Sequence, residues 1–327
     1  MYFLGCDAGS TKTELLITDE RGAVAAHGIY PACNYLMTGR EAFARAMREA
    51  IRVTLEKAEL DGAQLTYSVY GLPAYEESAE MRGMVPEALG AYAQPMHTLI
   101  CGDEVIGFAG SLGGKPGINV VAGTGSVVYG ENEKRDSARV GGWSLLFDDV
   151  GSCCWMGRQL LSIFFRQADG RMPRGPVYEL FRERFDLQEN HWDFVGEHLP
   201  LYNADRTALA ALQRMAGEAV ERGDAAAADL FEQAARGLCE MVSAVTVKLS
   251  SSGASAPMDV SYSGGLFRNG ARILEPFGRE IEVLGLRLVR PAYSPVVGAL
   301  ALGARQYLSE GSLQRMLSRA QRETAEG

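Results

Sequence analysis

Short apolar runs and polar turns alternate along the first part of the chain in the pattern of consecutive β-strands. Residues 3–18 form two mostly apolar runs around a polar, glycine-containing turn, which predicts an antiparallel hairpin. A second turn at 19–22 precedes the apolar stretch 23–28, so we expect a meander of three strands. Residues 40–60 then repeat apolar side chains at helical spacing, which predicts an amphipathic helix.

Shorter strands and helices follow in alternation. We expect strands at 66–70 and 97–101, with a helix at 78–92 between them. The chain turns at Pro73, because proline has no N–H to donate to a strand ladder. Residues 111–116 are rich in glycine and also hold a proline, so we interpret them as the linker to a second domain.

The second half repeats the opening pattern. Residues 117–130 again have the pattern of a strand, a Gly/Thr/Ser turn and a strand, and two such hairpins predict two similar lobes. A long Ala-rich helix is expected at 225–251, and strands at 258–262 and 286–289. The small residues of 295–304 predict a helix that packs closely against a neighbouring element.

The two glycine-containing turns have the groups that a phosphate cradle needs. Glycine lets backbone N–H groups approach an anion, and hydroxyl and ammonium groups add donors. The first turn has Gly9, Ser10, Thr11, Lys12 and Thr13, and the second has Gly123, Thr124, Gly125 and Ser126. Asp7, at the end of the first strand, could hold Mg²⁺ directly or through water. For either turn alone, an ordinary hairpin with a polar turn remains the alternative.

Several other stretches admit both a functional and a structural interpretation. Asp103 follows a strand and starts a helix, so it is either a helix cap or a site carboxylate. Trp143 follows a glycine pair and precedes two carboxylates, so it either lines a polar pocket or belongs to the core. Gly264 and Gly265 lie between an expected strand and an expected helix. They either leave room for a flat ring and offer helix N–H groups to a phosphate, or they are needed only for the geometry of the turn. Residues 171–224 show mixed charge and no pattern that indicates chemistry.

The composition is that of a globular protein. The 327 residues are 47% hydrophobic and 22% charged, enough for about two domains, and the net charge of −9 argues against a nucleic-acid partner. The six cysteines show no CxxC pairing and no His/Cys ligand spacing, so we expect buried reduced thiols and no zinc. The first apolar run is broken by Gly5 and Asp7, and no apolar stretch could span a bilayer, so we expect a cytoplasmic protein without a signal peptide or membrane segment.

Four motifs in this order resemble one known family. They are Asp-x-Gly-x-Thr-Lys-Thr at 7–13, Gly-Thr-Gly-Ser at 123–126, Ser-Gly-Gly at 263–265 and Pro-x-x-Gly-Ala-x-x-Leu-Gly at 295–303. Over nearly its whole length the chain resembles the BadF/BadG/BcrA/BcrD ATPase family, in particular the N-acetylglucosamine kinase branch of the sugar kinase and actin-like ATPase superfamily.

The resemblance implies an α/β fold of two ribonuclease-H-like lobes with ATP and Mg²⁺ in an interlobe cleft. The lobes would comprise residues 1–115 with about 295–327, and residues 116–294. By the same resemblance Asp103 is the base on the sugar 6-hydroxyl, and Thr11 and Thr124 contact the nucleotide. The sugar contacts that it implies are Asn34, Asp103, Gly142, Trp143 and Asp149. The expected function is ATP-dependent phosphorylation of an amino sugar, N-acetylglucosamine or a relative, and a homodimer is left open.

Some residues depart from the family pattern, and they leave the acceptor sugar unspecified. Val127 stands where an Asn is common, Val150 stands where a Glu is common, and Pro73 interrupts a run of small residues. The alternative function is that of a BadF-type ATPase that activates a partner enzyme, since such activators bind an iron–sulfur cluster through cysteines. Cys153 and Cys154 prompt this alternative, but adjacent cysteines rarely both ligate one cluster.

Overall fold

The computed structural model describes residues 1–9, 12–33, 35, 39–94, 96–188, 191–251 and 259–326. Its chain divides into two compact units. Unit 1 comprises Met1–Pro116 and Arg290–Gly327, and unit 2 comprises Gly117–Val289. The domain boundaries expected from the sequence, 1–115 with about 295–327 and 116–294, stay a prediction about which segments fold independently.

Unit 1 is one five-stranded sheet with helices on both faces. Its strands are β1 (Tyr2–Ala8), β2 (Lys12–Asp19), β3 (Val24–Pro31), β4 (Leu65–Leu72) and β5 (Thr98–Gly102), in the order β3-β2-β1-β4-β5. The first three form the predicted antiparallel meander, while β4 and β5 run parallel to β1. The helices are α2 (Arg40–Lys57), α3 (Ala79–Leu89), α4 (Asp103–Ser111), α13 (Pro295–Ala304) and α14 (Glu310–Glu326), with 3₁₀ turns at Gly62–Gln64 and Gly90–Tyr92.

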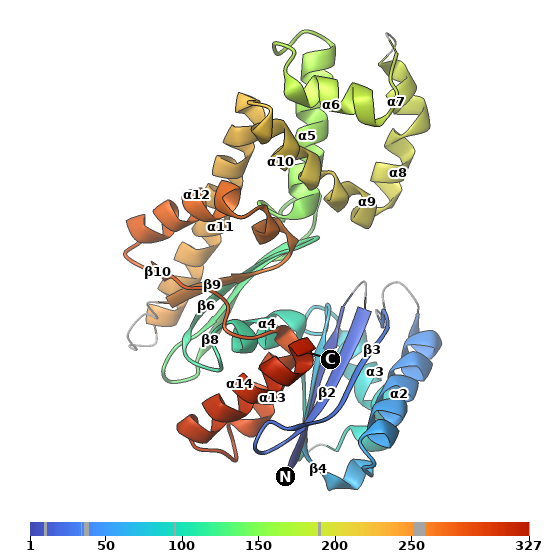
Figure 1. Ribbon diagram of the computed structural model, residues 1–327, viewed down its shortest axis with the longest axis vertical. Coiled ribbons are helices and arrows are strands. Elements are labelled where there is room, and N and C mark those ends of the chain that lie inside the picture. Colours follow the sequence, from blue (N-terminus) through green and yellow to red (C-terminus); the bar gives the residue numbers. More distant parts are fainter. Residues whose placement is uncertain are drawn as a thin grey trace. The chain divides into compact units, whose positions relative to one another are not determined.

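Alternation along the strands explains why this sheet has two covered faces. Leu15 and Ile17 of β2 belong to the core under α2 and α3, whereas Leu16 between them packs in the core under α13 and α14. Figure 1 shows α13 and α14 on one side of the sheet and α2 on the other. The near-continuous apolar strands of the first hairpin are therefore those of a sheet buried on both faces.

Helix α13 confirms the expected close packing of small residues. A Cβ added to Gly298 would lie 2.1 Å from the Ile106 carbonyl oxygen and 2.3 Å from the Gly110 nitrogen, so α13 and α4 touch through their backbones. A Cβ on Gly5 would likewise lie 2.6 Å from the Val296 carbonyl oxygen, so α13 also lies directly on β1. Glycine at these positions sets the distance at which α13 covers the sheet.

We expect Gly298→Ala to lower the stability of the protein. The added methyl group meets backbone atoms, which cannot move aside as a flexible side chain can, so the cost should be about 1–3 kcal/mol or more. Gly83→Ala in α3 is the matched control, because a Cβ there meets nothing within 4 Å and alanine favours a helix by about 0.5–1 kcal/mol. Urea denaturation measures both; equal midpoints for the two variants would contradict the backbone contact between α13 and α4.

Unit 2 carries a second five-stranded sheet and most of the helices. Its strands are β6 (Gly117–Ala122), β7 (Ser126–Glu131), β8 (Ser137–Gly141), β9 (Asp259–Ser263) and β10 (Arg287–Leu288). Its helices are α5 (Cys153–Ala168), α6 (Pro176–Arg184), α7 (Trp192–Glu197), α8 (Leu199–Ala204), α9 (Arg206–Ala211), α10 (Gln213–Glu221), α11 (Ala225–Ser250) and α12 (Ala271–Val283). A single apolar core joins the sheet to α5, α11 and α12.

The two sheets have the same topology, which confirms the prediction of two similar lobes. In the sheet of unit 2 the strand order is β10-β9-β6-β7-β8, so the first strand of the unit, β6, is again central. On one side β7 and β8 continue it as an antiparallel meander, and on the other side β9 and β10 run parallel to it. One expectation needs correction. The strand β9 is followed by a 3₁₀ helix at Gly265–Asn269, and α12 begins only at Ala271, so no α-helix N-terminus lies directly after Gly264.

Candidate active site

The carboxyl ends of the parallel strands in unit 1 bring two carboxylates to one edge of the sheet. Asp7 lies near the end of β1, in register with Gly71 of β4, and Asp103 directly follows β5. Since β1, β4 and β5 are parallel neighbours, their ends meet at the same edge. Gly102 occupies the cap position of α4, so Asp103 is the first helical residue. Its carboxylate lies in the first turn, where the helix N-terminus favours a negative charge, so the structural interpretation stays open beside that of a site carboxylate.

Both carboxyl groups hold their protons more tightly than usual. Burial raises the pKa of Asp7 to about 6, with a further rise from the neighbouring Glu14 carboxylate and a partial offset from Lys12. Lost hydration raises the pKa of the Asp103 carboxyl to about 6, although the side chain is exposed and solvent weakens the effect. The negative charge of Asp7 adds to this rise.

A small charge network lies beside Asp7. Glu14 is the cross-strand partner of Asp7, and its carboxylate binds the Lys12 ammonium at 2.5 Å and His27 Nε2 at 3.0 Å. Lys12, expected to face a phosphate, is thus already held by a carboxylate. Glu14 was not among the residues predicted to belong to the site. Its position two residues after Lys12, on the same face of a strand, could have indicated the Lys12–Glu14 ion pair.

The structure places only some of the first turn. The Gly9 N–H donates to the Lys12 carbonyl at 2.8 Å and closes the hairpin. Thr13 is buried, and its hydroxyl accepts a hydrogen bond from the Cys33 N–H at 2.9 Å, so it holds the segment after β3. Its phosphate contact stays a prediction. Ser10, Thr11 and Asn34 lie outside the described residues.

In unit 2 the two glycine motifs lie against each other at the carboxyl edge of the sheet. Gly123 is the first residue of the turn between β6 and β7. Its N–H donates a hydrogen bond to the Gly125 carbonyl at 2.9 Å, which closes the turn. Val121 pairs with Ser263 across β6 and β9. A Cβ on Gly264, whose φ is +104°, would lie 2.4 Å from the Ala122 carbonyl oxygen and 2.8 Å from the Gly123 nitrogen. The residue must therefore be glycine, because both its conformation and the contact exclude a side chain.

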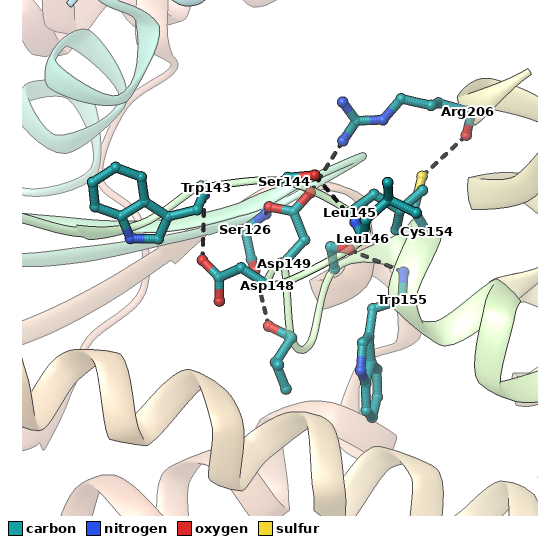
Figure 2. A network of polar contacts seen from close by, with 12 residues as sticks. Ser126, Trp143, Ser144, Leu145, Leu146, Asp148, Asp149, Cys154, Trp155 and Arg206 are labelled. Carbon is teal, nitrogen blue, oxygen red and sulfur yellow. Dashed lines mark hydrogen bonds and ion pairs between the residues drawn. The ribbon is translucent and has the colours of Figure 1, made fainter. Parts of the chain in front are cut away.

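The segment before α5 encloses the 123–126 turn. Ser126 Oγ donates to the Val150 carbonyl at 2.9 Å, and the Cys153 N–H donates to the Gly123 carbonyl at 2.7 Å. Asp149 is 3% exposed and has a φ of +56°, a conformation that costs a non-glycine residue about 1 kcal/mol or more. Its Oδ1 accepts from the Ser126 N–H at 3.4 Å, and its Oδ2 pairs with Arg206 at 3.1 Å, as Figure 2 shows.

The loop that carries Trp143 is open to solvent. Trp143 is 81% exposed, so the interpretation as a core aromatic is wrong. Its backbone N–H donates to Asp148 Oδ2 at 3.3 Å (Figure 2). Gly142 precedes it with a φ of +76°. The ring is therefore accessible to a ligand, and its contact with a sugar stays a prediction.

Comparison with known proteins identifies the family. The model of the BadF/BadG/BcrA/BcrD ATPase family matches residues 4–303. The chain belongs to this family. An N-acetyl-D-glucosamine kinase of Dictyostelium discoideum is 24% identical over 258 residues, which cover 76% of the chain and 80% of that relative. An N-acetylmuramic acid/N-acetylglucosamine kinase of Clostridium acetobutylicum is 24% identical over 272 residues, which cover 82% and 86%.

Solved structures show the same fold as this BadF-family ATPase. A Chromobacterium violaceum protein assigned as an N-acetylglucosamine kinase matches with a TM-score of 0.67 at 24% identity, over 92% of the chain and 98% of that structure. A Porphyromonas gingivalis protein with the same assignment matches with a TM-score of 0.66 at 18% identity, over 94% and 99%. A hexokinase of the ROK group from Thermus thermophilus matches with a TM-score of 0.52. The fold is that of the sugar kinase and actin-like ATPase superfamily.

The donor set of this ATPase suits Mg²⁺ and does not suit a cysteine-bound cluster. Mg²⁺ commonly uses one or two carboxylates together with substrate phosphates and water, which Asp7 can provide with Asp103 nearby. In the described part of the chain no group of three or more His, Cys, Asp or Glu side chains could hold a metal by itself. All six cysteines are free and buried, as predicted, so no thiol is exposed at the surface of the chain.

One departure from the family pattern has a packing explanation. A Cβ on Gly237 of α11 would lie 2.3 Å from Val150 Cγ1, so the Val150 side chain fits against a glycine of that helix.

Among the described helices, none is both long and apolar enough to cross a membrane.

Proposed function

We propose that this protein is an ATP-dependent kinase that transfers the γ-phosphoryl group to a hydroxyl of an amino sugar, N-acetylglucosamine or a relative. The observation that carries the proposal is the placement of two carboxylates, Asp7 and Asp103, at the same edge of the unit 1 sheet. The kinase names of the two relatives, each covering most of the chain, support the same reaction.

The residues divide the work of phosphoryl transfer, which consists mainly of positioning and charge neutralisation. Asp103 would accept the hydroxyl proton, for which its raised pKa is suited because a base near the working pH transfers protons most effectively. Asp7 would hold Mg²⁺, which neutralises phosphate charge when it is bound. The turns around Gly9, Gly123 and Gly264 would hold the nucleotide through their backbones. Asn34, Gly142 and Trp143 would contact the sugar. Asp149 is buried and its carboxylate is held by Arg206 and the Ser126 N–H, so its own sugar contact stays a prediction.

The test is ADP release from Mg-ATP with N-acetylglucosamine, glucosamine, N-acetylmuramic acid and plain hexoses. We expect turnover that depends on one of the amino sugars. ATP hydrolysis that no sugar changes, or iron–sulfur absorbance in anaerobically purified protein, would instead support the alternative of a partner-enzyme activator.

The raised carboxyl pKa values predict a specific pH dependence. Asp103 must be ionised to accept a proton, and below a pKa of about 6 it is protonated, so kcat/KM for the sugar should fall as the pH drops through 6. Melting curves at each pH exclude unfolding as the cause. A profile that is flat from pH 5 to pH 7 would contradict the role of these carboxylates.

A further inference from the structure

One ion pair connects the glycine turn of unit 2 with a helix that the sequence motifs do not include. Arg206 is the first residue of α9, in the region where the sequence indicated no chemistry. Its Nη2 lies 3.1 Å from Asp149 Oδ2, and Asp149 Oδ1 in turn accepts from the Ser126 N–H. Figure 2 shows this series of contacts, from the guanidinium through the carboxylate to the turn.

The carboxylate of Asp149 lies directly against the backbone of the turn. A Cβ on Gly125 would be 3.2 Å from Asp149 Oδ1. The Asp149 side chain is 4% exposed, whereas that of Arg206 is 57% exposed, so the pair joins a buried anion to a cation at the surface. A buried carboxylate without a counterion would repel phosphate groups bound at the same turn. Arg206 removes that repulsion and leaves the hydrogen bond to Ser126 in place.

The backbone of Arg206 is itself fixed in position. The Cys154 thiol donates to the Arg206 carbonyl at 3.1 Å (Figure 2). Helix α9 also packs on α5 without space for a side chain, since a Cβ on Gly157 would lie 2.2 Å from the Leu209 carbonyl oxygen. The N-terminus of α5 holds the turn through the bond from Cys153 to Gly123. Arg206 is thus presented to Asp149 from a helix that is anchored to the same structure as the turn.

We propose that Arg206 is a positioning residue for the nucleotide. It neutralises Asp149 and so keeps Gly125 and Ser126 in the arrangement that binds the phosphates. The inference rests on the proposed nucleotide role of the 123–126 turn, and it adds a residue outside every motif of the chain.

Calorimetric titration with MgADP tests the inference without relying on turnover. Arg206→Ala removes the guanidinium that pairs with the buried Asp149 carboxylate, so we expect MgADP to bind about tenfold more weakly or worse. Arg206→Lys keeps the charge and should recover most of the affinity. The double variant Arg206→Ala with Asp149→Asn removes both charges and should also recover most of it. Arg222→Ala is the matched control, because it removes a cation that pairs with Glu183 and Glu218 on the surface of unit 2 and should bind as the wild type does.

The outcomes separate the two proposals. Wild-type protein that does not bind MgADP would overturn the nucleotide role of the turn itself. Wild-type binding together with equal binding by Arg206→Ala would overturn the role of Arg206 alone. A double variant that stays as weak as Arg206→Ala would show that Arg206 serves only to pack α9, and would also overturn it. If Arg206→Ala does not fold, the lysine and double variants decide, since wild-type-like affinity in both is expected and weak binding by either contradicts the proposal.

Discussion

Asp103→Asn is expected to abolish sugar-dependent ADP release, with a fall in turnover of about 10²–10⁴-fold. The amide cannot accept the hydroxyl proton, and general-base catalysis contributes rate factors of about that size. The substitution is nearly isosteric, and the N-terminal position on α4 is kept, so the loss should reflect chemistry and not unfolding. Glu310→Gln is the matched control, because it removes an exposed carboxylate from the first turn of α14 in the same unit and should leave turnover unchanged.

The same variant should be more stable than the wild type at high pH. A carboxyl group whose pKa is raised from 3.8 to about 6 by folding stabilises the fold when protonated, and this contribution is lost as the pH rises through 6. At pH 8 the ionised Asp103 therefore opposes folding. Solvent screening of the exposed side chain reduces the effect, so the asparagine should raise the melting temperature by at most roughly 2–4 °C, about 1 kcal/mol for a unit of this size. At pH 4.5 the gain should shrink. Loss of activity with a lower melting temperature at pH 8 would contradict the assignment.

Gly264→Ala is expected to lower kcat/KM for ATP by about 10²-fold. An alanine at a φ of +104° is strained, and its methyl group would lie 2.4 Å from the Ala122 carbonyl oxygen, so β9 and the Gly123 turn must move apart. A displacement of about 1 Å among substrate-holding groups can cost a hundredfold in rate. Initial rates at varied ATP concentration give the measurement.

Gly270→Ala separates strain from displacement. Gly270 also has a positive φ, +61°, but a Cβ there meets nothing within 4 Å, so alanine pays only the conformational cost of about 1–2 kcal/mol. It should lower the melting temperature slightly and leave the Michaelis constant for ATP unchanged. Equal effects of the two substitutions on that constant would refute the contact between the two glycine motifs as a nucleotide-holding feature.

Much of the fold follows from local patterns that the sequence displays openly. The apolar strands, the polar turn between β1 and β2 and the small residues of α13 each indicate their own structure. The repeat of the hairpin indicates two lobes, and the common topology of the two sheets confirms it. The 3₁₀ helix after Gly264 was not predictable in this way, because five residues carry too little periodicity to distinguish it from the start of an α-helix.

The electrostatic environment of the site could not be predicted from the motifs. Glu14 pairs with Lys12 because strand alternation puts both on one face, and Arg206 reaches Asp149 only because α9 packs on α5. The Lys12–Glu14 pair has a local signature in its spacing. The Arg206–Asp149 pair depends on tertiary structure, because an arginine among the many charged residues of 171–224 has no such signature. For Thr13 the motif position predicted phosphate binding, and the structure adds a contact that the motif did not indicate, because its buried hydroxyl accepts a hydrogen bond from the Cys33 N–H.

Product analysis by phosphorus NMR tests the central claim most directly. The protein is incubated with Mg-ATP and the amino sugar that stimulates it best, and ADP and phosphorylated products are quantified in one spectrum. A kinase must form one sugar phosphate for each ADP, with little inorganic phosphate, and Asp103→Asn must suppress both products together. ADP accompanied by inorganic phosphate, with no sugar phosphate for any acceptor, would contradict the assignment of phosphoryl transfer to this site.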